Sequence, residues 1–116
     1  MARPAATPPP GDSLTSPALH ILLALVDGDR HGLGIADHVQ AFTSGRIMLG
    51  PGTLYGAIKR LLDAGLIVDA PARPRTDDDP RRRYYRLTAA GRRAVEAEAR
   101  AMAQVVDVAR LKRVLR

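Results

Sequence analysis

The stretch between Pro51 and Gly65 constrains the fold more than any other part of the sequence. Proline is favoured at the first position of a helix, where its missing N–H group costs nothing, and glycine just beyond the end, where the backbone turns left-handed. Between these two residues, apolar side chains recur at helical spacing: Leu54, Ile58, Leu61 and Leu62. The sequence therefore predicts a well-delimited amphipathic helix whose other face is polar and partly basic.

Two more helices are expected before this one. Ser16 and Pro17 suit an N-cap and a first helical position, and an apolar stripe follows them: Leu19, Leu22, Leu23 and Val26. This pattern predicts a first helix of about eleven residues. A second stripe, at Ile35, Val39 and Phe42, predicts a helix over about residues 33–43. Residues 47–49 form a short apolar link with the composition of a minimal strand.

The second half of the chain adds a hairpin and a long helix. Residues 66–68 and 84–87 are rich in β-prone side chains, and residues 73–83 between them are too polar to bury. They predict a hairpin with a long charged tip. Thr88 suits the N-cap of a last helix, which is expected to run to the C-terminus.

Composition limits the class of protein. The 116 residues give room for one small domain, and one Phe, three Tyr and no Trp leave the packing to aliphatic side chains, which favours helices. The absence of cysteine excludes disulfides, thiolate zinc sites and cysteine nucleophiles. The net charge is +6, and because only two arginines oppose four aspartates before residue 46, the positive charge lies in the second half. This half is expected to bind an anionic partner such as nucleic acid.

The order helix, helix, helix, hairpin, helix is that of a winged helix-turn-helix. We therefore expect a mainly α fold with a small β-hairpin, in which a winged helix-turn-helix is followed by a long C-terminal dimerisation helix. Residues 1–13, with four prolines, are expected to be a disordered Pro-rich arm. Residues 14–88 would form the DNA-binding domain, and residues 89–116 the dimerisation helix.

The start of the third helix is the first candidate contact with double-stranded DNA. Pro51 and Gly52, with Gly50 before them, allow the backbone to turn tightly and approach a duplex, and the free N–H groups of a helix start favour a phosphate. Thr53 and Tyr55 bring hydroxyl groups to the exposed first turns, where base edges or phosphates would lie. Lys59 and Arg60 lie further along the same helix and are expected to bind backbone phosphates.

The hairpin tip is the second candidate contact. Its arginines could straddle phosphates or place one guanidinium in a minor groove, and the sequence does not choose between these modes: Arg73, Arg75, Arg81, Arg82 and Arg83. If about six phosphates are neutralised, the log–log dependence of affinity on salt should have a slope of roughly −5.

Two separated motifs resemble the PadR family of bacterial transcriptional regulators. Residues 49–67, LGPGTLYGAIKRLLDAGLI, resemble its recognition helix, and residues 82–91, RRYYRLTAAG, resemble its second wing strand and the start of its dimerisation helix. Residues 18–25, ALHILLAL, and 31–35, HGLGI, fit its first two helices. The likeness spans about residues 16–105 and is to the short subfamily with one C-terminal helix. It implies a homodimeric repressor that is released from DNA by a small molecule at or near the dimer interface, or by another signal.

The last helix is the expected site of self-association. Its apolar stripe is longer and broader than one small domain needs, and its core positions are the candidate dimer interface: Val95, Ala99, Met102, Val105, Val106 and Ala109. A two-fold dimer would place two recognition helices about one DNA turn apart, so a pseudo-palindromic operator is expected.

A winged-helix module that binds an acidic protein is the alternative to a DNA-binding regulator. An enzyme is not expected, because the sequence lacks a phosphate loop and a catalytic constellation. No metal or cofactor is expected either, since His20, His31 and His38 lack ligand spacing, and residues 77–79, three adjacent aspartates, lack the spacing of a calcium loop. Without a long apolar run or a secretory signal, a cytoplasmic protein with no membrane contact is expected.

Overall fold

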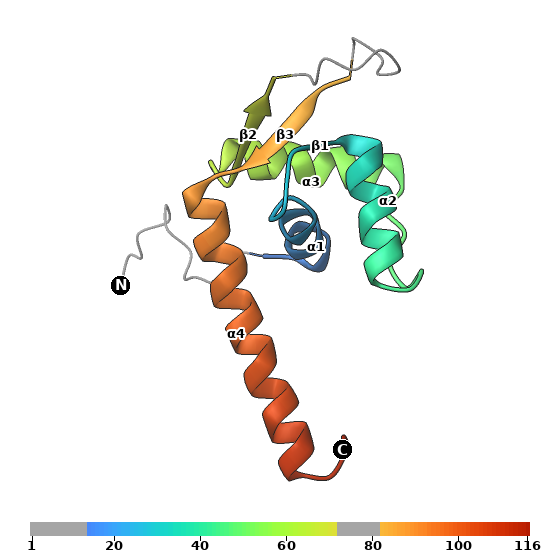
Figure 1. Cartoon of the computed structure of the whole chain (residues 1–116), viewed down its shortest axis with the longest axis vertical. Coiled ribbons are helices and arrows are strands. Elements are labelled where there is room, and N and C mark those ends of the chain that lie inside the picture. The colour runs from blue at the N-terminus through green and yellow to red at the C-terminus, as the bar shows by residue number, and fades with distance from the viewer. Residues whose placement is uncertain (1–13, 72–81) are drawn as a thin grey trace, which may run out of the picture.

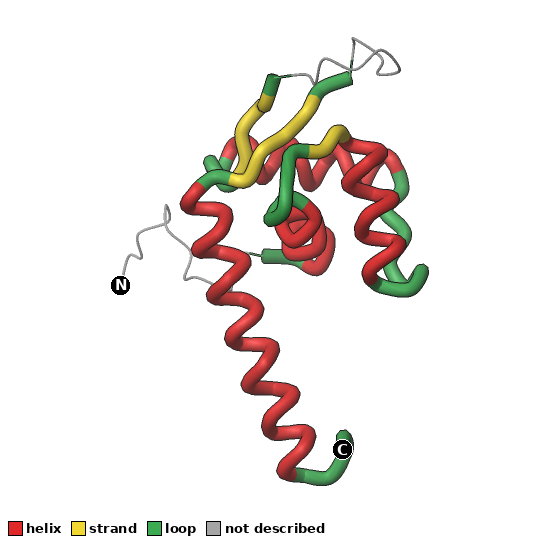
Figure 2. Tube along the Cα trace, viewed as in Figure 1, coloured by secondary structure: helices red, strands yellow, loops and turns green. Residues whose placement is uncertain are grey.

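The computed structural model describes residues 14–71 and 82–116. In these residues four helices and three short strands follow one another as α1 (Ser16–Ala24), β1 (Arg30–His31), α2 (Gly32–Phe42), α3 (Pro51–Asp63), β2 (Ile67–Ala70), β3 (Tyr84–Leu87) and α4 (Ala89–Leu111). Helices dominate, as Figure 2 shows by colour. The expected mainly α winged helix-turn-helix with a long C-terminal helix is confirmed (Figure 1).

Helix α1 is the centre of the domain and contacts α2, α3 and α4. Its N-cap is Thr15, whose hydroxyl accepts a hydrogen bond of 3.3 Å from the Ala18 N–H group, and not Ser16 as expected. The helix has nine residues and is shorter than predicted, because Leu25 already forms its C-cap. Most of its side chains are buried, so α1 is the element around which the other helices pack.

Helices α2 and α3 form the helix-turn-helix pair. The His31 side chain caps α2, its Nδ1 atom accepting a hydrogen bond of 3.1 Å from the Gly34 N–H group. Helix α3 has Pro51 at its start and Gly65 after its end with a φ of 75°, as the sequence predicts. Residues 47–49 form no strand and connect the two helices, so the suggestion of a minimal strand there is wrong.

The wing is the hairpin of β2 and β3. The two strands are antiparallel, with Ile67 opposite Leu87 and Ala70 opposite Tyr84. The third strand, β1, was not expected; it pairs with the other edge of β3 and places Arg30 opposite Tyr85, so the sheet order is β1-β3-β2. The hairpin is confirmed, and its expected charged tip lies largely outside the described residues.

The core is mainly aliphatic, as the composition predicts. Its largest fully buried side chains come from α1, α2, α3 and β2: Ile21, Leu22, Ile35, Val39, Leu54, Ile58 and Ile67. Tyr85 from β3 and Val95 from α4 complete the same cluster. Helix α3 and both strands of the wing therefore pack into one core.

Helix α4 has two different halves. Thr88 caps it by accepting a hydrogen bond of 3.0 Å from the Gly91 N–H group, as expected. Val95, a candidate for the dimer interface, is buried in the core of its own chain, because the first turns of α4 pack on the domain. The second half projects away from the other elements and ends at Leu111, before the C-terminus (Figure 1).

Gly91 marks the closest approach of α4 to the wing. A Cβ atom at this position would clash with the Leu66 carbonyl oxygen and lie 2.7 Å from Leu87 Cδ1. We expect Gly91→Ala to lower the free energy of unfolding by roughly 3 kcal/mol, the upper end of the cost of overpacking, because backbone atoms cannot yield easily. Denaturant unfolding would measure this. Gly52→Ala, where a Cβ atom meets nothing within 4 Å, is the matched control and should not destabilise the protein.

Candidate nucleic-acid interface

The first turn of α3 is open to solvent. Pro51, Gly52 and Thr53 are all exposed. The N-cap is Gly50, which has no side chain to bind the free N–H groups of the helix start. These donors carry the positive end of the helix dipole, so the turn is suited to an anion or to base edges.

Lys59 and Arg60 are exposed further along α3. The Lys59 ammonium group lies 3.2 Å from the Asp63 carboxylate, one turn away. Both partners are about two-thirds exposed or more, so solvent screens this pair and it contributes little to stability. Both cations therefore remain available to a polyanion.

Tyr55 connects α3 with α2 and the wing. Its side chain is 46% exposed and lines two hollows. The first, of about 340 Å³, lies between the start of α2 and the wing and is lined by His31, Gly32, Leu33, Tyr55, Arg82, Arg83 and Tyr85. The second, of about 360 Å³, lies between α3 and the wing and is lined by Tyr55, Ile58, Lys59, Leu62, Asp63, Arg83 and Tyr85. The exposed face of α3 thus continues without a break into the base of the wing.

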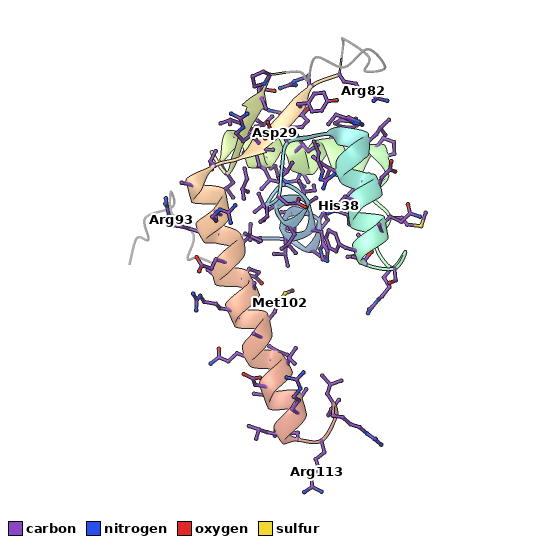
Figure 3. All side chains as sticks on the ribbon, in the orientation of Figure 1. Asp29, His38, Arg82, Arg93, Met102 and Arg113 are labelled. Atoms are coloured by element: carbon purple, nitrogen blue, oxygen red, sulfur yellow. The ribbon has the colours of Figure 1, made fainter. Side chains whose placement is uncertain are left out.

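The base of the wing carries two of the predicted arginines. Arg82 lies at the end of β3 away from α4 (Figure 3), and its Nη1 atom is 3.2 Å from Nε2 of His31. Arg83 binds one carboxylate oxygen of Asp69 on β2, with distances of 2.6 and 3.1 Å from Nη2 and Nε. Its guanidinium also lies 5.4 Å from the centre of the Tyr85 ring. The structure therefore brings Arg82 and Arg83 to the same face as Tyr55.

Two pKa shifts reflect this packing. The hydrogen bond to Asp69 raises the pKa of the Arg83 guanidinium above its ordinary value, so Arg83 stays charged. Burial raises the pKa of the Tyr85 hydroxyl group, so Tyr85 stays neutral at physiological pH. The base of the wing consequently combines the fixed positive charge of Arg83 with the neutral ring of Tyr85 beneath it.

Three predicted contacts, Arg73, Arg75 and Arg81, lie outside the described residues, as do the aspartates at 77–79. Three participants are not indicated by the sequence: His31 and Gly32 at the start of α2, and Asp69, which forms an ion pair with Arg83. No local pattern links them to the site, because each meets a partner that is distant in the sequence. Within residues 14–71 and 82–116, no three His, Cys, Asp or Glu side chains form a group suited to a metal ion.

The other predicted dimer residues lie between the middle of α4 and its C-terminal end. Ala99 is exposed, Ala109 is half-buried, and Met102, Val105 and Val106 are 47%, 68% and 36% exposed. Met102 extends from α4 on the side where α1 lies (Figure 3). No helix among the described residues combines the length and the apolar content needed to cross a membrane.

Comparison with known proteins identifies the family. Residues 21–97 match the profile of the transcriptional regulator PadR-like family. The chain belongs to this family. PadR-like proteins are DNA-binding transcriptional regulators and not enzymes, which confirms the family and the class of function expected from the sequence.

The chain also matches two curated proteins, of which one is a transcriptional regulator. The chain is 36% identical over 87 residues to the transcriptional regulator Rv3488 of Mycobacterium tuberculosis, and this match covers 75% of the chain and 76% of the relative. It is 40% identical over 85 residues to an uncharacterized 37.1 kDa protein in transposon TN4556 of Streptomyces fradiae. That match covers 73% of the chain and only 22% of the transposon protein, so the chain corresponds to a small part of it.

Solved structures show the same fold. A PadR family transcription regulator from Clostridium difficile R20291 superposes with a TM-score of 0.71 at 26% identity, covering 84% of this chain and 97% of that one. PadR of Bacillus subtilis, solved in complex with operator DNA, superposes with a TM-score of 0.57 at 22% identity, covering 68% of this chain and 44% of that one. The second likeness concerns the fold alone.

Proposed function

We propose that this PadR-like regulator is a homodimeric repressor that binds a pseudo-palindromic operator and is released by a small-molecule or other signal. Helix α3 enters the major groove with Thr53 and Tyr55 near base edges, and Pro51 and Gly52 bring the backbone close. The phosphates are held by basic side chains on α3 and the wing: Lys59, Arg60, Arg75, Arg81, Arg82 and Arg83. The protein acts in the cytoplasm, where this DNA lies.

The single observation that carries the proposal is the continuity of α3 with the wing. Tyr55, Lys59 and Arg83 line one hollow, although α3 and β3 are far apart in the sequence. A face that combines an open helix start, the hydroxyl groups of Thr53 and Tyr55, and arginines matches what a DNA groove and its flanking phosphates require. That the fold is shared with a PadR protein solved on operator DNA supports this docking.

The occupant that we propose for the exposed face of α4 is a second copy of the chain. Its apolar side chains recur at the spacing of a helix-helix seam, and the half that carries them projects beyond the domain (Figure 1). Two copies joined along α4 would present two α3 helices to one duplex, as a two-fold operator requires. The domain is taken as residues 14–88 and the dimerisation segment as 89–116, with Val95 belonging to the domain core.

The signal is proposed to act through the dimer. A small molecule bound between the protomers near α4 would change the separation of the two α3 helices. Because both half-sites are contacted at once, a shift of a few ångströms would weaken both sets of contacts together. Ligand and DNA would then lower each other's affinity.

The experiment that tests the proposal is a fluorescence anisotropy titration. A duplex from the upstream region of the protein's own gene and a scrambled duplex are compared at several salt concentrations. We expect a clear preference for the first duplex, two protomers per duplex and a log–log salt slope of roughly −5. Equal binding to both duplexes that vanishes at physiological salt would contradict the proposal and favour an acidic protein partner.

Asp69 is expected to limit the affinity for DNA, because it holds Arg83 in an ion pair and places a negative charge beside this arginine. Asp69→Asn should raise DNA affinity about threefold to fivefold, since an exposed pair of this kind is weak and easily exchanged for a phosphate. Glu96→Gln is the matched control: Glu96 pairs with Arg100 on α4 at 2.9 Å, and its loss should raise DNA affinity only slightly, through the change in overall charge. If Asp69→Asn leaves the DNA affinity unchanged, Arg83 is not part of the DNA interface.

A further inference from the structure

Gly32 and Tyr55 are in contact, although they belong to different helices. Gly32 is the first residue of α2 and is buried. A Cβ atom at this position would lie 2.5 Å from the Tyr55 hydroxyl oxygen, 2.8 Å from Cε1 and 2.9 Å from Cζ. The tyrosine ring therefore occupies the space that any other residue at position 32 would need.

The need for glycine at position 32 is steric and not conformational. Among the described glycines, the left-handed backbone belongs to Gly45 and Gly65, and Gly28 has a φ of 157°, whereas the backbone of Gly32 has no positive φ. All three of the nearest atoms belong to the far end of one side chain, that of Tyr55. Glycine at position 32 thus leaves the space that the Tyr55 ring occupies.

We propose that Gly32 is a positioning residue for Tyr55, which it allows to lie against the start of α2, where the tyrosine side chain lines both hollows beside the wing. This inference rests on the proposed function, in which Tyr55 contacts the operator. It makes the first turn of α2 a determinant of sequence preference, although Gly32 has no side chain with which to touch a base.

A side chain at position 32 would displace the ring and leave the fold intact. Tyr55 is 46% exposed, so its ring can rotate toward solvent without opening the core. Gly91 is the opposite case, because there a Cβ atom would meet backbone. Gly32→Ala should therefore unfold at nearly the same denaturant concentration as the unmodified protein.

The effect on DNA should be confined to specific binding. Gly32→Ala changes no charge, so the affinity for a scrambled duplex and the salt slope should stay the same. The affinity for the operator should fall about tenfold, a loss in the range of one well-made contact with a base edge. Gly34→Ala is the matched control in the same helix: its Cβ atom would lie 3.5 Å from the His31 ring, an ordinary contact, and should leave operator affinity unchanged.

A double-mutant cycle tests the positioning role by anisotropy titration of the full chain. We expect Tyr55→Ala to weaken operator binding, and Gly32→Ala to have no further effect when added to it, because the residue it acts through is gone. Equal losses from Gly32→Ala in both backgrounds, or full affinity of Gly32→Ala alone, would overturn the inference. Full affinity of Tyr55→Ala would instead contradict the proposed function at this position, so the two failures are distinguishable.

Discussion

Val106→Asp is expected to convert the protein to monomers and to lower its affinity for the operator by about a hundredfold or more. Val106 lies in the apolar stripe on the projecting half of α4 and is 36% exposed in the single chain. A carboxylate at the centre of a helix-helix seam would be buried without a partner, which is strongly unfavourable. The fold of each protomer should persist, because this half of α4 lies outside the core cluster.

Light scattering after gel filtration would measure the mass of the variant, and anisotropy its affinity for DNA. Gln104→Asp introduces the same charge on the opposite face of α4 and serves as the matched control. It should remain dimeric and bind normally. A Val106→Asp protein that is still dimeric would show that the stripe is not the interface.

Thr53→Asp is expected to weaken operator binding about a hundredfold while keeping the protein folded. Thr53 is exposed in the first turn of α3, where the proposed docking brings it to base edges and phosphates. A carboxylate there would face the negative charge of DNA, and such like-charge contacts cost enough to lower affinity by about a hundredfold. The same carboxylate interacts favourably with the helix dipole, so thermal stability should stay equal or rise slightly.

The control for Thr53→Asp is Gln40→Glu, which changes the net charge equally at an exposed position of α2. Operator affinity of this control should fall only slightly, through the change in overall charge. If both variants lose the same affinity, the effect of Thr53→Asp is a general charge effect and α3 does not read the duplex. If Thr53→Asp retains full affinity, the proposed orientation of α3 is wrong.

The sequence predicts those elements that are specified by local signals. Helix α3 is found because Pro51 and Gly65 mark its two ends and a single apolar stripe lies between them. The hairpin and the Thr88 cap follow from equally local features. Strand β1 could not be found this way, because Arg30 and His31 are polar and acquire strand geometry only by pairing with Tyr84 and Tyr85.

In the candidate site, too, features with local sequence signals are predictable and contacts between distant residues are not. The exposed face of α3 follows from helical periodicity, so Tyr55, Lys59 and Arg60 are placed correctly on the surface. Its contacts with Gly32 and Arg83 depend on how α2 and the wing pack, which no local pattern encodes. Val95 illustrates the limit of a stripe: the same periodicity continues from the core of the domain onto the projecting half of α4. The sequence alone does not indicate where the contacts of α4 with its own domain end.

The most direct test of the central claim is selection of bound sequences from a pool of random duplexes by the full chain. A homodimer that reads DNA with two α3 helices should enrich an inverted repeat whose half-sites are centred about 10 base pairs apart, one turn of the duplex. The repeat should disappear from pools selected with Val106→Asp. Enrichment of no sequence, or of a single motif without two-fold symmetry, would contradict the account.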